Sequence, residues 1–142
     1  MLKSGCIILT IWSLLNLAAS GAILSETLLG RGHTPAVYSL LNEDEVSELS
    51  PKTLATIDSI AVYANGLNIA FCLVSTVVVW AGLYRRRIWC LWGLVGGYAA
   101  ALAAGVGGDY MVGTLMWEVT GISGCILAVG LGLAAVGLGE PA

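Results

Sequence analysis

Glu118 is the one ionisable side chain within the four long apolar stretches of this chain. A charged residue near the middle of a membrane span costs about 2.5–3.5 kcal/mol on insertion scales, so its presence marks a candidate functional site. No lysine, arginine or histidine is expected at its level. Because apolar surroundings without a cation favour a neutral carboxyl group, we expect Glu118 to be protonated and to donate a hydrogen bond.

Neutral polar side chains are expected at a similar depth in the other three stretches. Counted at about 1.5 Å per residue from the outer ends, Glu118 lies about 9 Å deep, and Asn65 and Asn68 lie about 8 and 12 Å deep. Asn65 and Asn68 share a helix face because they are three residues apart. Ser20 lies nearest the level of Asn68, and Tyr98 lies near the middle of its stretch. These five residues form the predicted ligand or proton site.

Glu118 has three interpretations. In the structural one, it donates to Asn65, Asn68 or Tyr98 and joins helices with about 0.6–2 kcal/mol. In the functional one, it exchanges protons or binds a cationic or polar ligand that enters from outside. In the third, it faces another subunit. The structural interpretation is favoured, because transporters usually carry more than one such group and this chain has one.

Residues for other kinds of chemistry are missing from the sequence pattern. Cys6, Cys72, Cys90 and Cys125 form no C-x-x-C pair, and they are interpreted as small buried hydrophobes. His33 is the sole histidine, so a metal site would lack further ligands. No nucleophile–base set, H-E-x-x-H pair or phosphate loop occurs. We therefore expect neither an enzyme nor a bound metal or cofactor.

The four apolar stretches lie at about 4–25, 60–83, 88–107 and 112–136, and each is about as long as the ~20 residues that cross a bilayer. The hydrophobic fraction of 58% and the charged fraction of 11% fit a lipid environment rather than a soluble domain. At 142 residues the chain has room for one domain. We predict an all-α, up-down-up-down bundle of four transmembrane helices, with the first stretch kept as an uncleaved span.

The segment 30–59 is the one extended polar region, and we expect it to lie outside the membrane and to be partly helical. Asn42 followed by acidic residues is typical of a helix start, which predicts a short helix over 43–49. Ser50 and Pro51 repeat the start signal. The second long helix should therefore run from 51 to about 86, with its first turns outside the lipid.

Three adjacent arginines, Arg85, Arg86 and Arg87, separate the second and third stretches. Such a cluster is typical of the cytoplasmic side of a membrane, and Lys3 agrees because two crossings separate it from the arginines. We predict an integral plasma (inner) membrane protein with both termini in the cytoplasm. Nucleic acid is not an expected partner, since orientation explains the one basic run.

Thirteen of the nineteen glycines fall within 88–139. Small residues recur at every fourth position on one face of the third stretch (Gly93, Gly97, Ala101 and Gly105) and on one face of the fourth stretch (Thr120, Gly124, Ala128 and Gly132). Such stripes let helices approach closely in a membrane. The favoured interpretation is a hairpin of the third and fourth spans, and the alternative is a seam between copies. Gly130 and Gly137 lie off the stripe and leave room for a second contact.

Together these patterns favour a non-enzymatic multi-pass protein that acts as a subunit, scaffold or oligomerising partner in a membrane assembly. Its expected partners are the lipid bilayer and either further copies or other membrane subunits. The alternative is a small transporter or ligand-binding membrane protein that uses Glu118 with Asn65 and Asn68.

Overall fold

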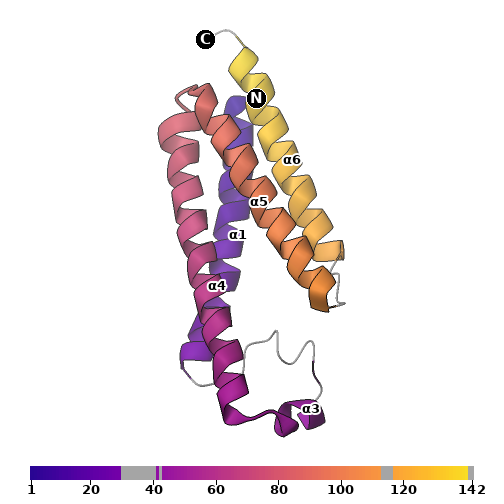
Figure 1. Ribbon diagram of the computed structural model, residues 1–142. Coiled ribbons are helices and arrows are strands. Elements are labelled where there is room, and N and C mark those ends of the chain that lie inside the picture. Colours follow the sequence, from indigo (N-terminus) through magenta and orange to yellow (C-terminus); the bar gives the residue numbers. More distant parts are fainter. Residues whose placement is uncertain (30–40, 42, 113–116, 141–142) are drawn as a thin grey trace. The chain divides into compact units, whose positions relative to one another are not determined.

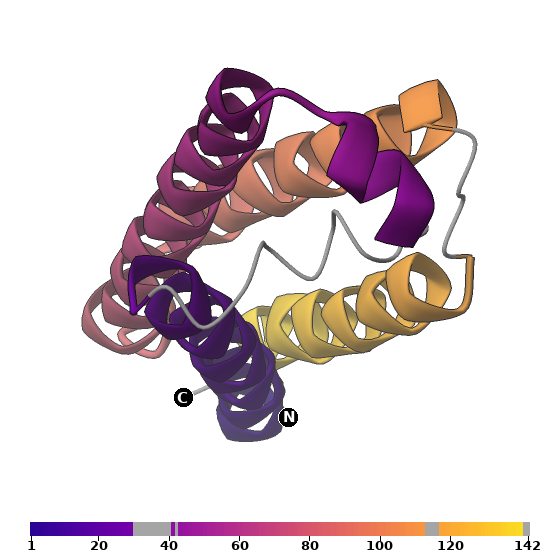
Figure 2. The ribbon, with the colours of Figure 1, turned by 90° about the horizontal axis from the view of Figure 1, so that it is seen from below.

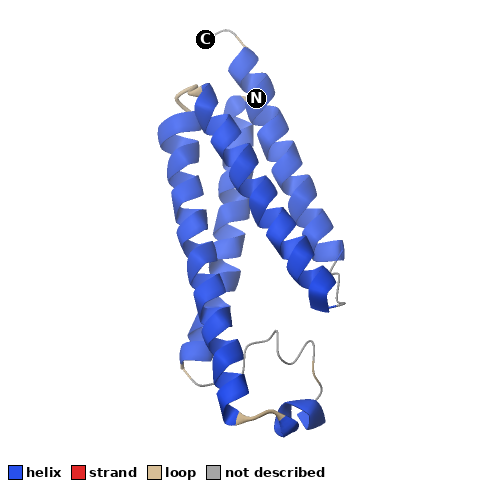
Figure 3. Ribbon diagram, in the orientation of Figure 1, coloured by secondary structure: helices blue, strands red, loops and turns tan. Residues whose placement is uncertain are grey.

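The computed structural model describes residues 1–29, 41, 43–112 and 117–140 of the chain. This part is almost entirely helical and contains no strand (Figure 3). In chain order its elements are α1 (Leu2–Leu28), α3 (Glu43–Glu48), α4 (Pro51–Val78), the π-helix η1 (Val79–Leu83), α5 (Ile88–Val112) and α6 (Trp117–Gly139) (Figure 1). Four of the helices are long and apolar enough to cross a membrane. The predicted all-α membrane fold is confirmed.

The ends of the helices differ from the expected spans in informative ways. The second helix begins at Pro51 as predicted, but its last turn is the π-helix η1, and it ends at Leu83 rather than at about 86. Of the fourth expected span, residues 113–116 lie outside the described part of the chain, and α6 is described from Trp117 to Gly139. Apolar composition alone sets the expected limits, and it does not register a change in helix type or the position of a cap.

The chain forms two compact units. Unit 1 contains residues 1–14 and 73–142, and unit 2 contains residues 15–72. Within the described residues, unit 1 therefore holds the first half of α1, the end of α4, and all of η1, α5 and α6. Unit 2 holds the second half of α1, α3 and most of α4.

In unit 1, the first turns of α1 lie beside the last turns of α6 (Figure 2). A Cβ atom at Gly5 would lie 2.6 Å from both the backbone nitrogen of Ala134 and the carbonyl oxygen of Gly130. A Cβ atom at Gly137 would overlap the backbone of Leu2. The two helices come this close because both lack side chains at the crossing. Gly130 and Gly137 thus make the second contact that the sequence left room for.

Hydrogen bonds also join α1 to the end of the second long helix within unit 1. Ser13 Oγ and Ser75 Oγ lie 3.2 Å apart, and both serines are buried. Trp80 Nε1 donates to Thr10 Oγ1 over 2.9 Å, and Thr10 Oγ1 donates in turn to the carbonyl oxygen of Cys6 over 2.8 Å. Bonds of this kind take the place of the hydrophobic drive that lipid removes between helices.

The turn between η1 and α5 closes with a helix-ending hydrogen-bond pattern. The Arg87 N–H donates to the Gly82 carbonyl over 3.2 Å, and the Arg86 N–H donates to the Leu83 carbonyl over 2.9 Å. This pair is the Schellman motif, whose penultimate residue is usually glycine because it adopts a left-handed conformation. Arg86 occupies that place with φ of 61°. Arg86 therefore adopts a backbone conformation that its side chain makes unfavourable.

Unit 2 contains the helix starts that the sequence predicts. The short helix α3 runs from Glu43 to Glu48, one residue shorter than predicted. Ser50 Oγ accepts a hydrogen bond from the Thr53 N–H over 3.1 Å, so Ser50 caps α4 as predicted. The cap assigned to Asn42 lies outside the described residues, as does most of the polar segment before it.

Candidate functional site

In unit 2, Ser20 and Asn68 come together between α1 and α4. Asn68 Nδ2 donates to Ser20 Oγ over 2.7 Å, and Asn68 Oδ1 accepts a weak bond from Cys72 Sγ over 3.9 Å. Ser20 is buried. Both functional groups of the Asn68 amide are therefore used in holding the protein together.

The other predicted site residue of unit 2 has a local role. Asn65 Nδ2 donates to the carbonyl oxygen of Ala61 over 2.9 Å, one turn earlier in α4. An amide that bonds to its own helix is satisfied without a ligand. Asn65 and Asn68 thus lie on one helix but have different partners.

Tyr98 lies in the core of unit 1, where it packs against Trp12. The two rings meet edge to face, with centroids 5.1 Å apart and an angle of 77° between their planes. Trp12 Nε1 also donates to Ser123 Oγ over 3.2 Å. Trp12 therefore connects α1 to both α5 and α6.

Trp12 is a structural residue that the sequence analysis overlooked, although the sequence contains a signal for it. The tryptophan lies within an apolar stretch rather than at either of its ends. Because its N–H needs a partner when the ring is buried, such a position predicts a polar side chain on a neighbouring helix. Ser123 is that side chain.

Glu118 belongs to unit 1 and lies in the first turn of α6, where its side chain is exposed. The depth of about 9 Å, which was counted from residue 112, stays a prediction. Measured from the helix start at Trp117, Glu118 lies about 1.5 Å along the axis. A carboxylate at this place is favoured by the helix dipole.

The five predicted residues are therefore brought together only in part. Ser20 and Asn68 bond to each other, Asn65 bonds to its own helix, and Tyr98 and Glu118 belong to the other unit. A single layer around Glu118 stays a prediction.

Two faces of small residues are largely uncovered, named here the α5 face (Gly93, Gly97, Ala101 and Gly105) and the α6 face (Thr120, Gly124, Ala128 and Gly132). Among the described atoms, none outside the local helix and chain neighbours lies within 4 Å of a Cβ position at Gly93, Gly105, Gly124 or Gly132. The helices α5 and α6 do contact each other, but these four glycines mediate no close approach. The tight crossing in unit 1 uses other glycines, those of α1 and the opposite side of α6.

The cysteines follow the same division. Cys6, Cys72 and Cys90 are buried as predicted, whereas Cys125 is exposed. Cys125 shares a helix face with Ile122 and Val129, which are also exposed. A small apolar side chain is acceptable there because lipid or another helix can cover it.

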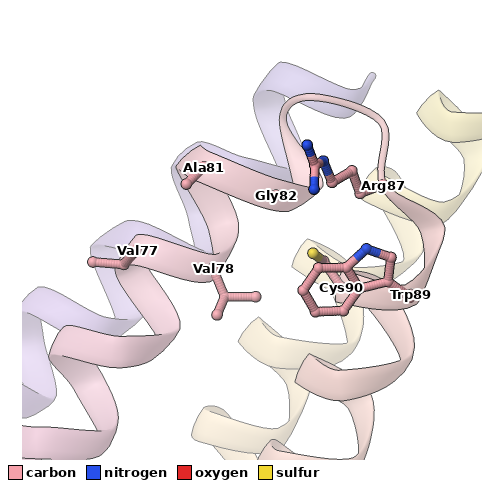
Figure 4. Close-up of a pocket in the computed structure, with 7 residues that line it drawn as sticks. All are labelled: Val77, Val78, Ala81, Gly82, Arg87, Trp89 and Cys90. Atoms are coloured by element: carbon pink, nitrogen blue, oxygen red, sulfur yellow. The ribbon is translucent and has the colours of Figure 1, made fainter.

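A groove of about 280 Å³ lies beside the arginine turn in unit 1. Its lining comes from the end of the second long helix, the turn and the start of α5, and it consists of Val77, Val78, Ala81, Gly82, Arg87, Trp89 and Cys90. Val78 and the Trp89 ring face each other across the hollow, with Arg87 above them (Figure 4). Its lining is mainly apolar, and Arg87 is the one charged residue in it.

Polar contacts at the chain ends lie close to the same turn. Arg86 Nη1 donates to the carbonyl oxygen of Glu140 over 2.6 Å, and the amino group of Met1 lies 3.4 Å from Glu140 Oε2. Both groups of the ion pair are substantially exposed, so the pair adds little stability.

No family model, curated protein or solved structure matches this chain.

Proposed function

We propose that this chain is a non-enzymatic multi-pass membrane protein that acts as a subunit or scaffold of a membrane assembly. In this proposal, its α5 and α6 faces pack against a second copy of the chain. The observation that carries the proposal is the open space at Gly93, Gly105, Gly124 and Gly132. Small residues in membrane helices serve close approach, and within the described chain these four have nothing close to approach.

The packing within unit 1 supports a separate role for the α5 and α6 faces. Gly5, Gly130 and Gly137 already make the close α1–α6 crossing. Hydrogen bonds that involve Thr10, Trp12 and Ser13 hold α1 to the rest of unit 1. The α5 and α6 faces are thus not needed for that crossing. They are available to another helix.

The orientation that we propose places both termini in the cytoplasm, with the protein in the plasma (inner) membrane. The positive-inside tendency of the three arginines supports it. So do the contacts of Glu140, which join Met1 and Arg86 at one end of unit 1.

Assembly can be tested with leucine substitutions on the two faces. We expect Gly97→Leu and Gly124→Leu to shift the protein from an oligomer to a monomer in mild detergent, because the larger side chain separates the packed backbones. Light scattering after size exclusion measures this change in mass. Ala99→Leu is the matched control, since Ala99 is exposed and lies about 200° around the helix from Gly97.

A monomeric wild-type protein would contradict self-association, as would an oligomer that survives both face variants. A stoichiometric different protein that co-purifies with the wild type and is lost with Gly124→Leu would assign the faces to another subunit instead.

A further inference from the structure

The groove beside the arginine turn has the composition of a lipid site. Its walls are apolar and open outward, since Val77 and Trp89 are each 63% exposed. The floor is closed, because Gly82 and Cys90 are both buried and a Cβ atom at Gly82 would overlap Cys90 Sγ. A volume of about 280 Å³ is near the lower limit for small-molecule pockets, so it suits one segment of an acyl chain.

The charge at the groove indicates which end of a lipid lies there. The arginines lie between two candidate spans, which end at Leu83 and begin at Ile88, and this is the level of lipid headgroups. Arg87 lines the groove, whereas Arg86 donates to Glu140. A guanidinium group binds phosphate through two parallel hydrogen bonds. Basic residues beside membrane spans attract anionic lipids.

We propose that the groove binds one anionic phospholipid, with its phosphate on Arg87 and part of an acyl chain between Val78 and Trp89. The apolar walls alone would accept any lipid tail, and the arginine selects a headgroup without a compensating positive charge. A zwitterionic lipid carries the same phosphate but adds a cation, which three neighbouring arginines repel. The site does not depend on self-association of the chain.

Native mass spectrometry of the full chain, titrated with phosphatidylglycerol and with phosphatidylcholine of the same acyl chains, tests this site. We expect one phosphatidylglycerol to bind at least fivefold more tightly than phosphatidylcholine. Arg87→Gln should remove that preference, and Arg85→Gln is the matched control of equal charge change and should alter it less than twofold. Val78→Phe, which fills the groove, should weaken both lipids.

Three results would overturn the proposal. Equal binding of the two lipids would show that no anionic site exists. Equal losses from Arg85→Gln and Arg87→Gln would show a diffuse basic surface. Displacement of the lipid by glycerol phosphate at equal concentration would show a phosphate site without a role for the groove. A folded Arg87→Lys variant with intermediate binding would support the two-bond geometry, because lysine keeps the charge but lacks the fork.

Discussion

Glycines with the same chemistry have opposite roles along this chain, and their surroundings decide which. Gly5 is enclosed by the backbone of α6, whereas Gly21 on the same helix has no atom of another described segment within 4 Å of its Cβ position. A methyl group has no place in the first case and costs nothing in the second. Single substitutions can therefore separate packing from helix propensity.

Gly5→Ala is expected to lower the free energy of unfolding by about 1–3 kcal/mol, because backbone atoms of Gly130 and Ala134 cannot yield as a flexible side chain would. Gly21→Ala should instead leave stability unchanged or raise it by up to about 1 kcal/mol, as helix propensity predicts. Thermal unfolding in detergent, followed by circular dichroism, measures both. Equal effects of the two variants would contradict the close crossing of α1 and α6.

Glu118 is a further residue whose position in its helix leads to a prediction. Its place in the first turn of α6 gives the carboxylate a favourable interaction with the helix dipole of about 0.3–1 kcal/mol. We therefore expect Glu118→Gln to lower the unfolding free energy by no more than about 1 kcal/mol and to leave the oligomer intact. Unfolding and light scattering of the same samples check this.

The transporter alternative makes a different prediction for the same variant. If Glu118→Gln left folding and assembly unchanged but abolished a proton-coupled flux in vesicles, the scaffold proposal would be wrong. Asn65→Ala is a second variant for this test, because the side chain of Asn65 donates its hydrogen bond within α4 and not to α1.

Among the elements, the turn between η1 and α5 shows how a local conflict is retained. Its hydrogen-bond pattern favours glycine at the left-handed position, but the residue at that position is Arg86. A non-glycine residue there costs about 1–2 kcal/mol. The Arg86 side chain, which causes this cost, also donates a hydrogen bond to the carbonyl oxygen of Glu140. The turn is thereby joined to the residue that follows α6.

Replacing Arg86 by glycine and by alanine separates these two effects. Both variants lose the bond to Glu140, but only glycine adopts φ of 61° without strain. We expect Arg86→Gly to be about 1 kcal/mol more stable than Arg86→Ala. Chemical unfolding of the purified variants gives the difference. If alanine proved as stable as glycine, the left-handed turn would not describe the folded protein.

At the level of elements, the sequence predicted well wherever one local signal was sufficient. Apolar runs identified all four long helices, and Ser50 with Pro51 marked the start of α4. The π-helix η1 escaped prediction because an apolar run does not distinguish a π-helix from an α-helix. The α1–α6 crossing also escaped, since the partner of Gly5 depends on how distant helices are arranged, and the sequence does not record that arrangement.

The candidate site was predicted in its parts but not in its grouping. Ser20 and Asn68 were recognised as polar groups of one depth, and they do bond. Depth says nothing about rotation, however, so Tyr98 could not be assigned to Trp12. The groove at Arg87 was not predicted, because this arginine was interpreted as a signal of orientation. That interpretation explains its charge but does not predict which residues lie beside it.

At the scale of the whole molecule, the proposed orientation in the membrane can be tested by labelling single cysteines. A cysteine at Glu45, in the exposed part of α3, should react with an impermeant maleimide added to intact cells. Arg85→Cys, also exposed, should react only after the cells are permeabilised. Both variants belong in a background without the four native cysteines. The opposite labelling pattern would invert the proposed orientation.

Self-association through the α5 and α6 faces is the central claim, and cysteine cross-linking in membranes tests it most directly. Single cysteines at Ala101 and Ala128 lie on the faces, and those at Ala103 and Val129 lie about 200° and 100° away around the same helices. All four positions are exposed in the single chain. We predict that oxidation joins two chains through a cysteine at Ala101 or Ala128 and leaves Ala103→Cys and Val129→Cys monomeric. Cross-linking that is equal at all four positions, or absent from both faces, would contradict the claim.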